Sequence, residues 1–286
     1  MNGNTTAPLH NTLAFFRLSS PQQSLNTLVK SWFVVALVGQ WFFAVYVFLI
    51  SVLPVISGKP MSADFSHMIT GLIVGDHKGN FILFAHLIPA AILSFCGVLQ
   101  LVPHIKLRYP AFHRWNGRLF LLLGLIGALT GLYLTWIRGS RFSDIGAVGV
   151  TINGLLIPIA VYLAWRYARK GRVDAHKRWA VHSFMLVNGV WTLRLYMMGW
   201  FIINQGPNGN NNTFDGPADM FFSFACYLLP MLIVELVFWA RKQGNTLRVV
   251  GVSIMMGLGT AVTAIGVIGA AAFMWLPRIQ VLLVNA

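Results

Sequence analysis

Long apolar runs separated by shorter polar segments make up most of the chain. A helix needs about 20 apolar residues to cross the hydrocarbon core of a membrane, and seven runs reach that length. Because this core offers no water to a free backbone group, the runs are predicted to be α-helices. Their approximate bounds are 31–53, 81–102, 117–137, 146–167, 179–203, 219–240 and 249–276.

The fold predicted from this pattern is all-α, a polytopic membrane bundle of seven transmembrane helices. Composition agrees, since 57% of the residues are hydrophobic and 10% are charged, whereas soluble domains carry about a quarter charged residues. The first run ends without a small-residue cleavage site, which favours a retained span over a signal peptide. Residues 1–286 are therefore interpreted as a single integral membrane domain. Cys96 and Cys226 lie within apolar runs and are interpreted as packing thiols.

Basic residues divide unequally between the two sets of loops that alternate along the chain. One set, which starts with the N-terminal segment, holds fifteen Lys and Arg and one acidic residue, and the other holds five of each kind. The positive-inside rule then predicts a cytoplasmic N-terminus and an extracytoplasmic C-terminus, in a multi-pass protein of the inner (plasma) membrane. The formal charge of +14 reflects this topology and contact with membrane lipids, so no nucleic-acid partner is predicted.

Two long loops are predicted on the extracytoplasmic side. Residues 54–80 contain a stretch that is able to form a short interfacial helix. Residues 204–218 are rich in Asn, Gly and Pro, and are predicted to be irregular and mobile.

Two polar side chains inside spans, His86 and Arg194, are predicted to share an outer pocket. Arg194 lies about 13 Å from the outer end of the fifth run at 1.5 Å per residue, and His86 lies at a similar depth in the second run. Intramembrane charges are costly and mark functional sites by default. Alternatively, Arg194 snorkels to the interface and His86 bonds a neighbouring helix. A pocket lined by both would suit an anionic or quinone-like ligand.

Glu235, the single glutamate of the chain, lies about 7 Å inside the cytoplasmic end of the sixth run, at a depth similar to that of His182 in the fifth. An inner pair of Glu235 and His182 would neutralise both groups and fix the imidazole tautomer. The alternative interpretation is that Glu235 reaches Arg241 or Lys242 at the lipid head groups.

Two clusters of histidine, arginine and tryptophan precede the third and fifth runs, "HRWNGR" at 113–118 and "HKRWAVH" at 176–182. In a structural interpretation, the arginines bind lipid phosphates, the tryptophans occupy the interface and the histidines fill polar gaps. In a functional interpretation, imidazoles from two neighbouring helices hold the iron of haem b. The axial ligands would be His113 and either His176 or His182, and the haem propionates would bind Arg114, Arg118 and Arg178.

The segment from the second to the fifth run resembles a known family. "HLIPAAILSFCGVLQLVPHIKLRYPAFHRWNGRLF" and "DAHKRWAVHSFMLVNGVWTLRL" are similar to a bacterial membrane-protein family called domain of unknown function 2306. The shared features are an H…G.LQ helix, an R-x-R/K-x-P-x-H-R-x-x-G-R loop and an H-R-R-W-M-x-R-S…T-L-R helix. The resemblance covers about 82–200 and implies a four-helix core, flanked by the first, sixth and seventh runs. The matching positions are His86, Gly97, Gln100, Arg108, His113, Arg114, Gly117, Arg118, His176, Arg178, Trp179, Ser183 and Arg194.

These patterns predict a membrane-embedded redox protein that binds haem b and works with a quinone or a small electron carrier. The alternative is a non-catalytic transport or accessory subunit, whose clusters bind lipid or order the bundle. A transporter proper is disfavoured, because the sequence has no visible inverted repeats and no broken helices in matched halves.

Overall fold

The computed structural model describes residues 20–57, 71–141, 143–243 and 245–284. Long helices dominate these residues and no strand occurs among them, which confirms the all-α prediction. The α-helices are α1 (Pro21–Val47), α2 (Leu53–Ile56), α3 (His77–Cys96), α4 (Pro103–Arg108), α5 (Pro110–Trp136), α6 (Asp144–Arg169), α7 (Val173–Val187), α8 (Gly189–Ile203), α9 (Pro217–Gln243), α10 (Thr246–Ala270) and α11 (Leu276–Val284). Two π-helical turns, Phe48–Val52 and Ala271–Trp275, continue α1 and α10.

The seven predicted spans are present. Among the described residues, six helices are long and apolar enough to cross a membrane, and the bent pair of α7 and α8 makes a seventh span. Each helix begins before its predicted apolar run, and α1, α3, α6 and α10 do so at a polar residue whose side chain caps the helix. Ser20 and Gln23 form a capping box at α1. Asp76 and Ser143 accept the N–H groups of Gly79 and Gly146 at the starts of α3 and α6, so the polar flanks are part of the helices.

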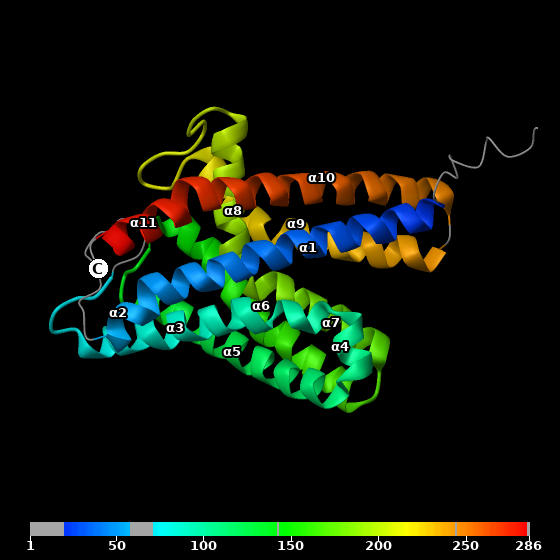
Figure 1. Cartoon of the computed structure of the whole chain (residues 1–286), viewed down its shortest axis with the longest axis horizontal. Coiled ribbons are helices and arrows are strands. Elements are labelled where there is room, and N and C mark those ends of the chain that lie inside the picture. The colour runs from blue at the N-terminus through cyan, green and yellow to red at the C-terminus, as the bar shows by residue number, and fades with distance from the viewer. Residues whose placement is uncertain (1–19, 58–70, 142, 244, 285–286) are drawn as a thin grey trace, which may run out of the picture.

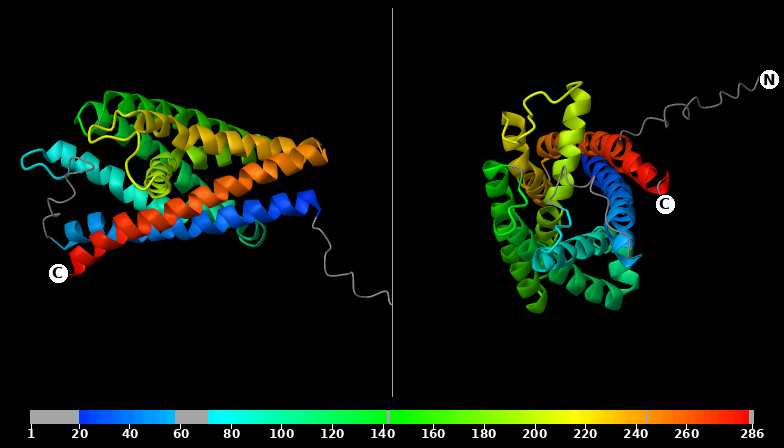
Figure 2. Two further views of the ribbon diagram at one scale, coloured as in Figure 1. Left: turned by 90° about the horizontal axis from the view of Figure 1, so that it is seen from above. Right: turned by 90° about the vertical axis from the view of Figure 1, so that its left-hand side faces the viewer.

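The bundle has two ends that differ in character. One end, which we call the basic end, holds the N-termini of α1, α5, α7 and α10, together with α4. The loop end holds the N-termini of α3, α6 and α9, together with α11 and the segment 204–216. α1 and α10 lie side by side and run in the same direction, from the basic end to the loop end (Figures 1 and 2).

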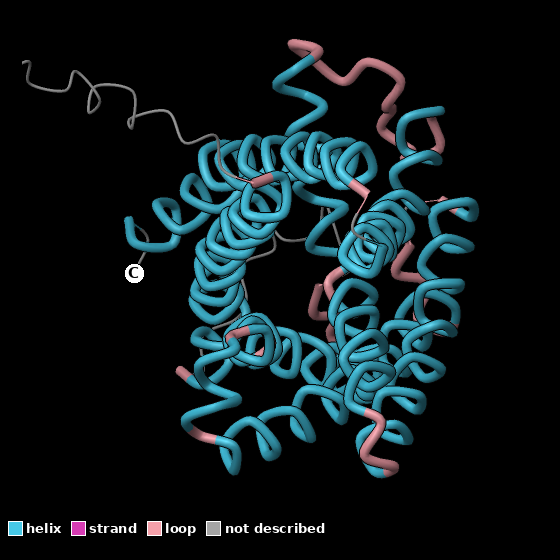
Figure 3. The backbone as a smooth tube through the Cα atoms, turned by 90° about the vertical axis from the view of Figure 1, so that its right-hand side faces the viewer, coloured by secondary structure: helices cyan, strands magenta, loops and turns pink. Residues whose placement is uncertain are grey.

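The helices form a closed ring around the bundle axis. α1 packs between α10 and α3, α3 packs on α5, and α5 packs on α6. α6 packs on α7 and α9, while α8 packs on α9 and α10 and so closes the ring (Figure 3). Inward-facing side chains from helices that are remote in sequence therefore meet inside it.

The span made of α7 and α8 is broken at Asn188 and bent by 58°. α8 turns away from the direction shared by its neighbours (Figure 1). The sequence predicted one continuous helix over 179–203, and the structure corrects that detail. Transporters carry such broken helices in matched halves, and within the described ranges this is the one bent pair.

Amide side chains from two other helices brace this break. Gln40 of α1 donates to the Asn188 side-chain oxygen at 2.6 Å, and Asn188 in turn donates to the Phe184 carbonyl. Asn153 of α6 donates to the Leu186 carbonyl at 3.1 Å. The Phe184 carbonyl also accepts the backbone N–H of Asn188, so the side chains add partners at the end of α7 and build the break into the packing.

The segment 204–216 is irregular, as its Asn and Gly residues predict. Its polar groups bond one another, and Asp219 accepts the N–H of Asn211. Asp215 accepts hydrogen bonds from Thr213 and Asn211, which hold the pKa of its exposed carboxyl below the usual range. These contacts give the segment a defined path without a helix.

The other long loop, 54–80, is described in part. Arg138, at the end of α5, binds the Asp76 carboxylate at 3.0 Å and donates to the Gly71 carbonyl at 2.9 Å. These bonds attach the approach to α3 to the turn that follows α5. The interfacial helix was predicted on 61–74; residues 61–70 lie outside the described residues, and 71–74 are not helical.

Candidate functional site

Arg178, His182 and Glu235 meet in the basic-end half of the bundle. α7 presents Arg178 and His182 on one face because they are four residues apart, and α9 places Glu235 opposite them. Nε2 of His182 lies 2.5 Å from Oε1 of Glu235, and Nε of Arg178 lies 2.6 Å from the same oxygen. The second carboxylate oxygen bonds Nη2 of Arg178, so the Arg178–Glu235 ion pair is bidentate. We call these three residues the inner triad.

Glu235 does not use the alternative partners that the sequence left open. Arg241 donates from Nη2 to Oδ1 of Asn26 at 2.9 Å and thereby ties the end of α9 to α1. Within the described part of the chain, the ion pairs of Glu235 are those with Arg178 and His182.

A pocket of about 260 Å³ opens beside the inner triad, between α7 and α9. Its lining residues are Arg178, Trp179, His182, Met231, Leu232 and Glu235. Leu232 is 51% exposed on a helix that spans the membrane, so this side of α9 faces lipid. The pocket therefore joins a charged group near the head-group level to the apolar surroundings of the protein.

The imidazole of His182 lies behind the Glu235 carboxylate, with 5% of its side chain exposed. The Trp179 ring packs edge-on against it at 5.7 Å. Because an ionised carboxylate accepts hydrogen bonds only, Nε2 of His182 is the protonated nitrogen of this ring. Nδ1 is then the acceptor nitrogen, and it is buried without a hydrogen-bond partner among the described residues.

His113, at the start of α5, bonds the side chain of Gln100. The amide orientation that satisfies this network lets the Gln100 oxygen accept from Asn116 and from the Gly117 N–H. The Gln100 nitrogen then donates to Nδ1 of His113 at 3.2 Å. Nδ1 is thus an acceptor, and the proton of the neutral His113 ring is on Nε2.

His176, at the start of α7, has the opposite tautomer. Its Nδ1 lies 2.9 Å from the carbonyl oxygen of Ala164 in α6, so Nδ1 carries the proton and donates. Nε2 is left with its lone pair. Metal-bound histidines commonly donate their second nitrogen to a carbonyl in this way.

These tautomers do not fit haem held by two histidines. Such ligation needs a nitrogen lone pair from each side, and Nε2 of His182 is bound to Glu235 while Nε2 of His113 is protonated. Of the expected propionate partners, Arg178 pairs with the Glu235 carboxylate and Arg118 lies 4.7 Å over the Trp115 ring. Arg114 is exposed. Of the three expected ligands, His176 presents an available nitrogen, and no group of three metal-ligating side chains occurs in the described ranges.

His86 lies deep in the loop-end half of the bundle and bonds α5. Its Nδ1 is 3.0 Å from the Thr130 hydroxyl. Because that hydroxyl donates to the Ile126 carbonyl at 2.6 Å, Nδ1 of His86 is the donor to Thr130. His86 makes no hydrogen bond to Arg194 among the bonds of the described residues, although the charge of Arg194 acts on it.

Arg194 lies inside the bundle rather than reaching for the head groups. It donates to the Val190 carbonyl, and its guanidinium lies 5.5 Å over the Phe43 ring of α1. Arg278 of α11 donates to the Tyr46 hydroxyl at 2.9 Å, and both groups interact electrostatically with Arg194. Sequence reasoning missed Arg278 and Tyr46, because Arg278 lies beyond the last predicted run, 249–276, and was counted with the loop cations.

The fold and these two polar clusters define a polytopic, all-helical membrane protein with one polar cluster in each half. The model of a family described as predicted membrane proteins, DUF2306, matches residues 83–239. This match covers more than half of the chain, so the chain belongs to that family. The resemblance noted in the sequence is confirmed, and it extends further than expected because it includes most of α9 and Glu235. No curated protein and no solved structure matches the chain.

Proposed function

We propose that this chain is a redox protein of the membrane that binds the head group of a quinone in the pocket beside the inner triad. The observation that carries the proposal is a pocket that combines a carboxylate, an imidazole and a guanidinium with walls facing lipid. A quinone is a ring with two carbonyl acceptors on an apolar tail, and this pocket offers polar groups at one end and apolar surface at the other.

Each residue that lines the pocket would make a different contact with the quinone. Arg178 keeps N–H donors beyond those given to Glu235, and one of them is available to a quinone carbonyl. In the quinol form, the ligand hydroxyl donates to the Glu235 carboxylate, which accepts only. Met231 and Leu232 supply apolar wall for the ring and the start of the tail. His182 lies behind the Glu235 carboxylate and holds it in place. Its Nε2 is a second hydrogen-bond donor to this carboxylate, beside Arg178.

We expect Glu235→Gln to weaken binding of decylubiquinol to the purified protein by about tenfold or more, because a charge-assisted hydrogen bond and the bidentate Arg178 pair are both lost. Binding is measured by titration of intrinsic tryptophan fluorescence, since Trp179 lines the pocket. Asp174→Asn is the matched control, an exposed acid in the first turn of α7, and is expected to bind as the parent does. Equal affinity in the Gln variant and the parent would remove the proposal.

A second candidate, haem b, is favoured by the hydrogen bond that leaves Nε2 of His176 available. When bound, haem would supply one-electron transfer to or from the quinone. The expected result is a Soret band in protein purified from haem-replete cells that is lost in His176→Ala and kept in His113→Ala. A colourless parent protein would rule out this candidate and leave the quinone site to be tested separately.

We also propose that the basic end faces the cytoplasm in the inner membrane, with the C-terminus outside, because Lys and Arg concentrate at that end. In a background without Cys96 and Cys226, an impermeant maleimide added to intact cells is expected to label Asn212→Cys and not Lys170→Cys. Labelling of both variants after lysis controls for reactivity. Labelling of Lys170→Cys from outside would invert the proposed orientation.

A further inference from the structure

The exposed side of α5 combines tryptophan, arginine and leucine near the basic end. Trp115, Arg118, Leu119 and Leu122 are all exposed, and their spacing places them on one side of the helix. Because α5 is long and apolar enough to cross the membrane, leucines exposed along it face lipid. Arg118 therefore lies where the lipid-facing side of α5 meets the basic end.

The neighbouring helix α6 brings a second tryptophan to Arg118. α5 and α6 pack on each other and run in opposite directions, so the last turns of α6 lie beside the first turns of α5. The guanidinium carbon of Arg118 lies 4.7 Å from the centre of the Trp115 ring and 6.0 Å from that of the Trp165 ring. Attraction between the cation and these rings holds Arg118 at the line where the two helices meet.

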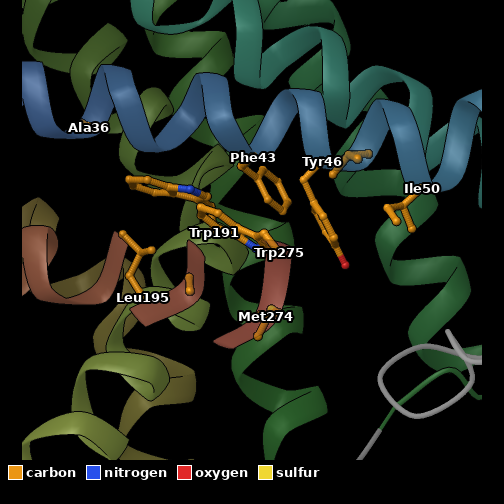
Figure 4. Packing of buried hydrophobic residues seen from close by; sticks show 10 residues of the cluster. Ala36, Phe43, Tyr46, Ile50, Trp191, Leu195, Met274 and Trp275 are labelled. Carbon is orange, nitrogen blue, oxygen red and sulfur yellow. The ribbon is translucent and has the colours of Figure 1, made fainter. Parts of the chain in front are cut away.

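These two tryptophans differ in position from those at the other end of the bundle. Figure 4 shows Trp191 of α8 and Trp275 of the π turn packed against α1, and Trp275 is completely buried. Trp115 and Trp165 are exposed instead, at 69% and 40%. Exposed tryptophan on a membrane helix is typical of the head-group level. The rings around Arg118 therefore place its charge at the depth of lipid head groups.

The N–H donors of Arg118 are unused. Its contacts with the two rings use the charge of the guanidinium and none of its hydrogen bonds. In the described part of the chain Arg118 makes no hydrogen bond, and the ion pairs there belong to other residues. A guanidinium presents its donors as a planar fork that matches two oxygens of a phosphate.

A second arginine lies one turn before Arg118. Arg114 is exposed as well and has no ion pair among the described residues. Side chains at this spacing have Cβ atoms about 5–6 Å apart, and like charges there repel. The chain has no acidic residue between Asp76 and Asp144, so neither α4 nor α5 has a carboxylate to balance this pair. An anion from outside the protein would pair with both arginines and remove their repulsion.

We propose that Arg114, Trp115, Arg118 and Trp165, which we call the basic–aromatic corner, bind one anionic phospholipid. The phosphate accepts hydrogen bonds from the two arginines, and the acyl chains lie along the exposed leucines of α5. A lipid fits better than a free anion because the arginines stand at the start of an apolar surface that a free anion leaves uncovered. A net negative head group fits better than a zwitterionic one, which would bring a further cation to the pair. Basic clusters between membrane helices are typical sites for acidic head groups.

The basic–aromatic corner is separate from the quinone pocket, which lies between α7 and α9. The proposal therefore stands whether or not a quinone binds. It also does not depend on which side of the membrane the basic end faces.

The test measures lipid binding to the purified full-length protein in detergent by native mass spectrometry, with phosphatidylglycerol and phosphatidylcholine titrated separately. The parent is expected to bind its first phosphatidylglycerol about tenfold more tightly than phosphatidylcholine. Arg118→Gln is expected to lower the affinity for phosphatidylglycerol by about fivefold or more and to leave that for phosphatidylcholine nearly unchanged. Arg114→Gln is expected to act in the same direction with a smaller effect.

Arg172→Gln is the matched control. Arg172 is exposed at the basic end and lies 5.6 Å over the Tyr167 ring, so this change removes the same charge and one ring contact outside the basic–aromatic corner. The variant is expected to bind phosphatidylglycerol as the parent does. If Arg118→Gln does not fold, Arg114→Gln decides alone.

Four outcomes would overturn the proposal. The first is a parent protein without preference for phosphatidylglycerol, and the second is a preference that both variants of the corner keep. The third is an equal loss in Arg172→Gln and Arg118→Gln, since net charge rather than the corner would then attract the lipid. The fourth is displacement of bound phosphatidylglycerol by an equal concentration of inorganic phosphate, which would make a free anion the ligand.

Discussion

Replacing Gly266 with leucine is expected to separate α10 from α8 and to lower the free energy of unfolding by about 3 kcal/mol. A Cβ atom at this position would lie 2.5 Å from the backbone oxygen of Leu195 and 2.7 Å from its Cβ. Backbone cannot move aside as the tip of a side chain does, so the two helices must shift apart. Small residues serve this purpose at close contacts between membrane helices.

Gly251→Leu is the matched control for this prediction. Gly251 is in the same helix, is exposed, and has nothing within 4 Å of an added Cβ. Both substitutions improve intrinsic helix propensity by a similar amount, so the difference between them reports the contact with α8. The measurement is the thermal midpoint of the purified variants in detergent. If the Gly266→Leu and Gly251→Leu proteins have the same thermal midpoint, the packing of α8 on α10 does not depend on this contact.

Trp275→Ala is expected to lower the free energy of unfolding by about 3–5 kcal/mol, the range for removing a large buried aromatic side chain. Trp275 is fully buried, and its ring centroid lies 5.5 Å from that of Phe42, 5.6 Å from that of Phe43 and 6.2 Å from that of Tyr46. These are distances at which aromatic pairs attract beyond their buried area. Its removal leaves a cavity where α1 meets the end of α10.

Trp115→Ala removes the same side chain from the surface and serves as the comparison. Trp115 is 69% exposed and contacts the Arg118 guanidinium at 4.7 Å, a contact worth about 1 kcal/mol or less at such a position. Urea or thermal unfolding of both variants in the same detergent measures the difference. If the two variants lose similar stability, the aromatic cluster around Trp275 does not hold the ends of α1 and α10 together.

The spans were predictable from the sequence because the membrane imposes one rule on every segment that crosses it. An apolar run of sufficient length has no alternative to the helix. The starts of the helices were less predictable, since they depend on single capping residues such as Ser20 and Asp76 in polar segments. A scan for caps in the polar segments before the runs would have recovered the starts of α1, α3, α6 and α10.

The sequence at Asn188 contains a local indication of the break, but the length of the apolar run around it favoured one continuous helix. Asn188 and Gly189 form an Asn-Gly pair, which is typical of turns, but apolar residues on both sides made one long run. The break also depends on Gln40 and Asn153, which bond groups at the junction from α1 and α6. No pattern within the run contains that information.

For the two polar clusters, the sequence predicted how deep each residue lies in the membrane, but not which residues it bonds. Counting residues along a helix gives axial level, because the rise per residue is constant, and His182 and Glu235 are joined where equal depth placed them. Which nitrogen of His113 is protonated depends on Gln100 from another helix. Arg278 was counted as a loop cation, because nothing in the run indicated that α11 would continue the span.

The π-helical turn Ala271–Trp275 determines how the chain tolerates changes of length near Arg278. In a regular α-helix, deleting one residue rotates everything beyond it by about 100°. A π turn holds one residue more than an α turn, so a deletion within it restores α geometry and leaves later side chains on the same side. Loss of Ala271 would thus keep Arg278 beside Tyr46, whereas loss of Ala261 would turn it away. One residue can therefore be removed within the π turn without moving Arg278 away from Tyr46, whereas a removal before the turn would change the side on which Arg278 lies.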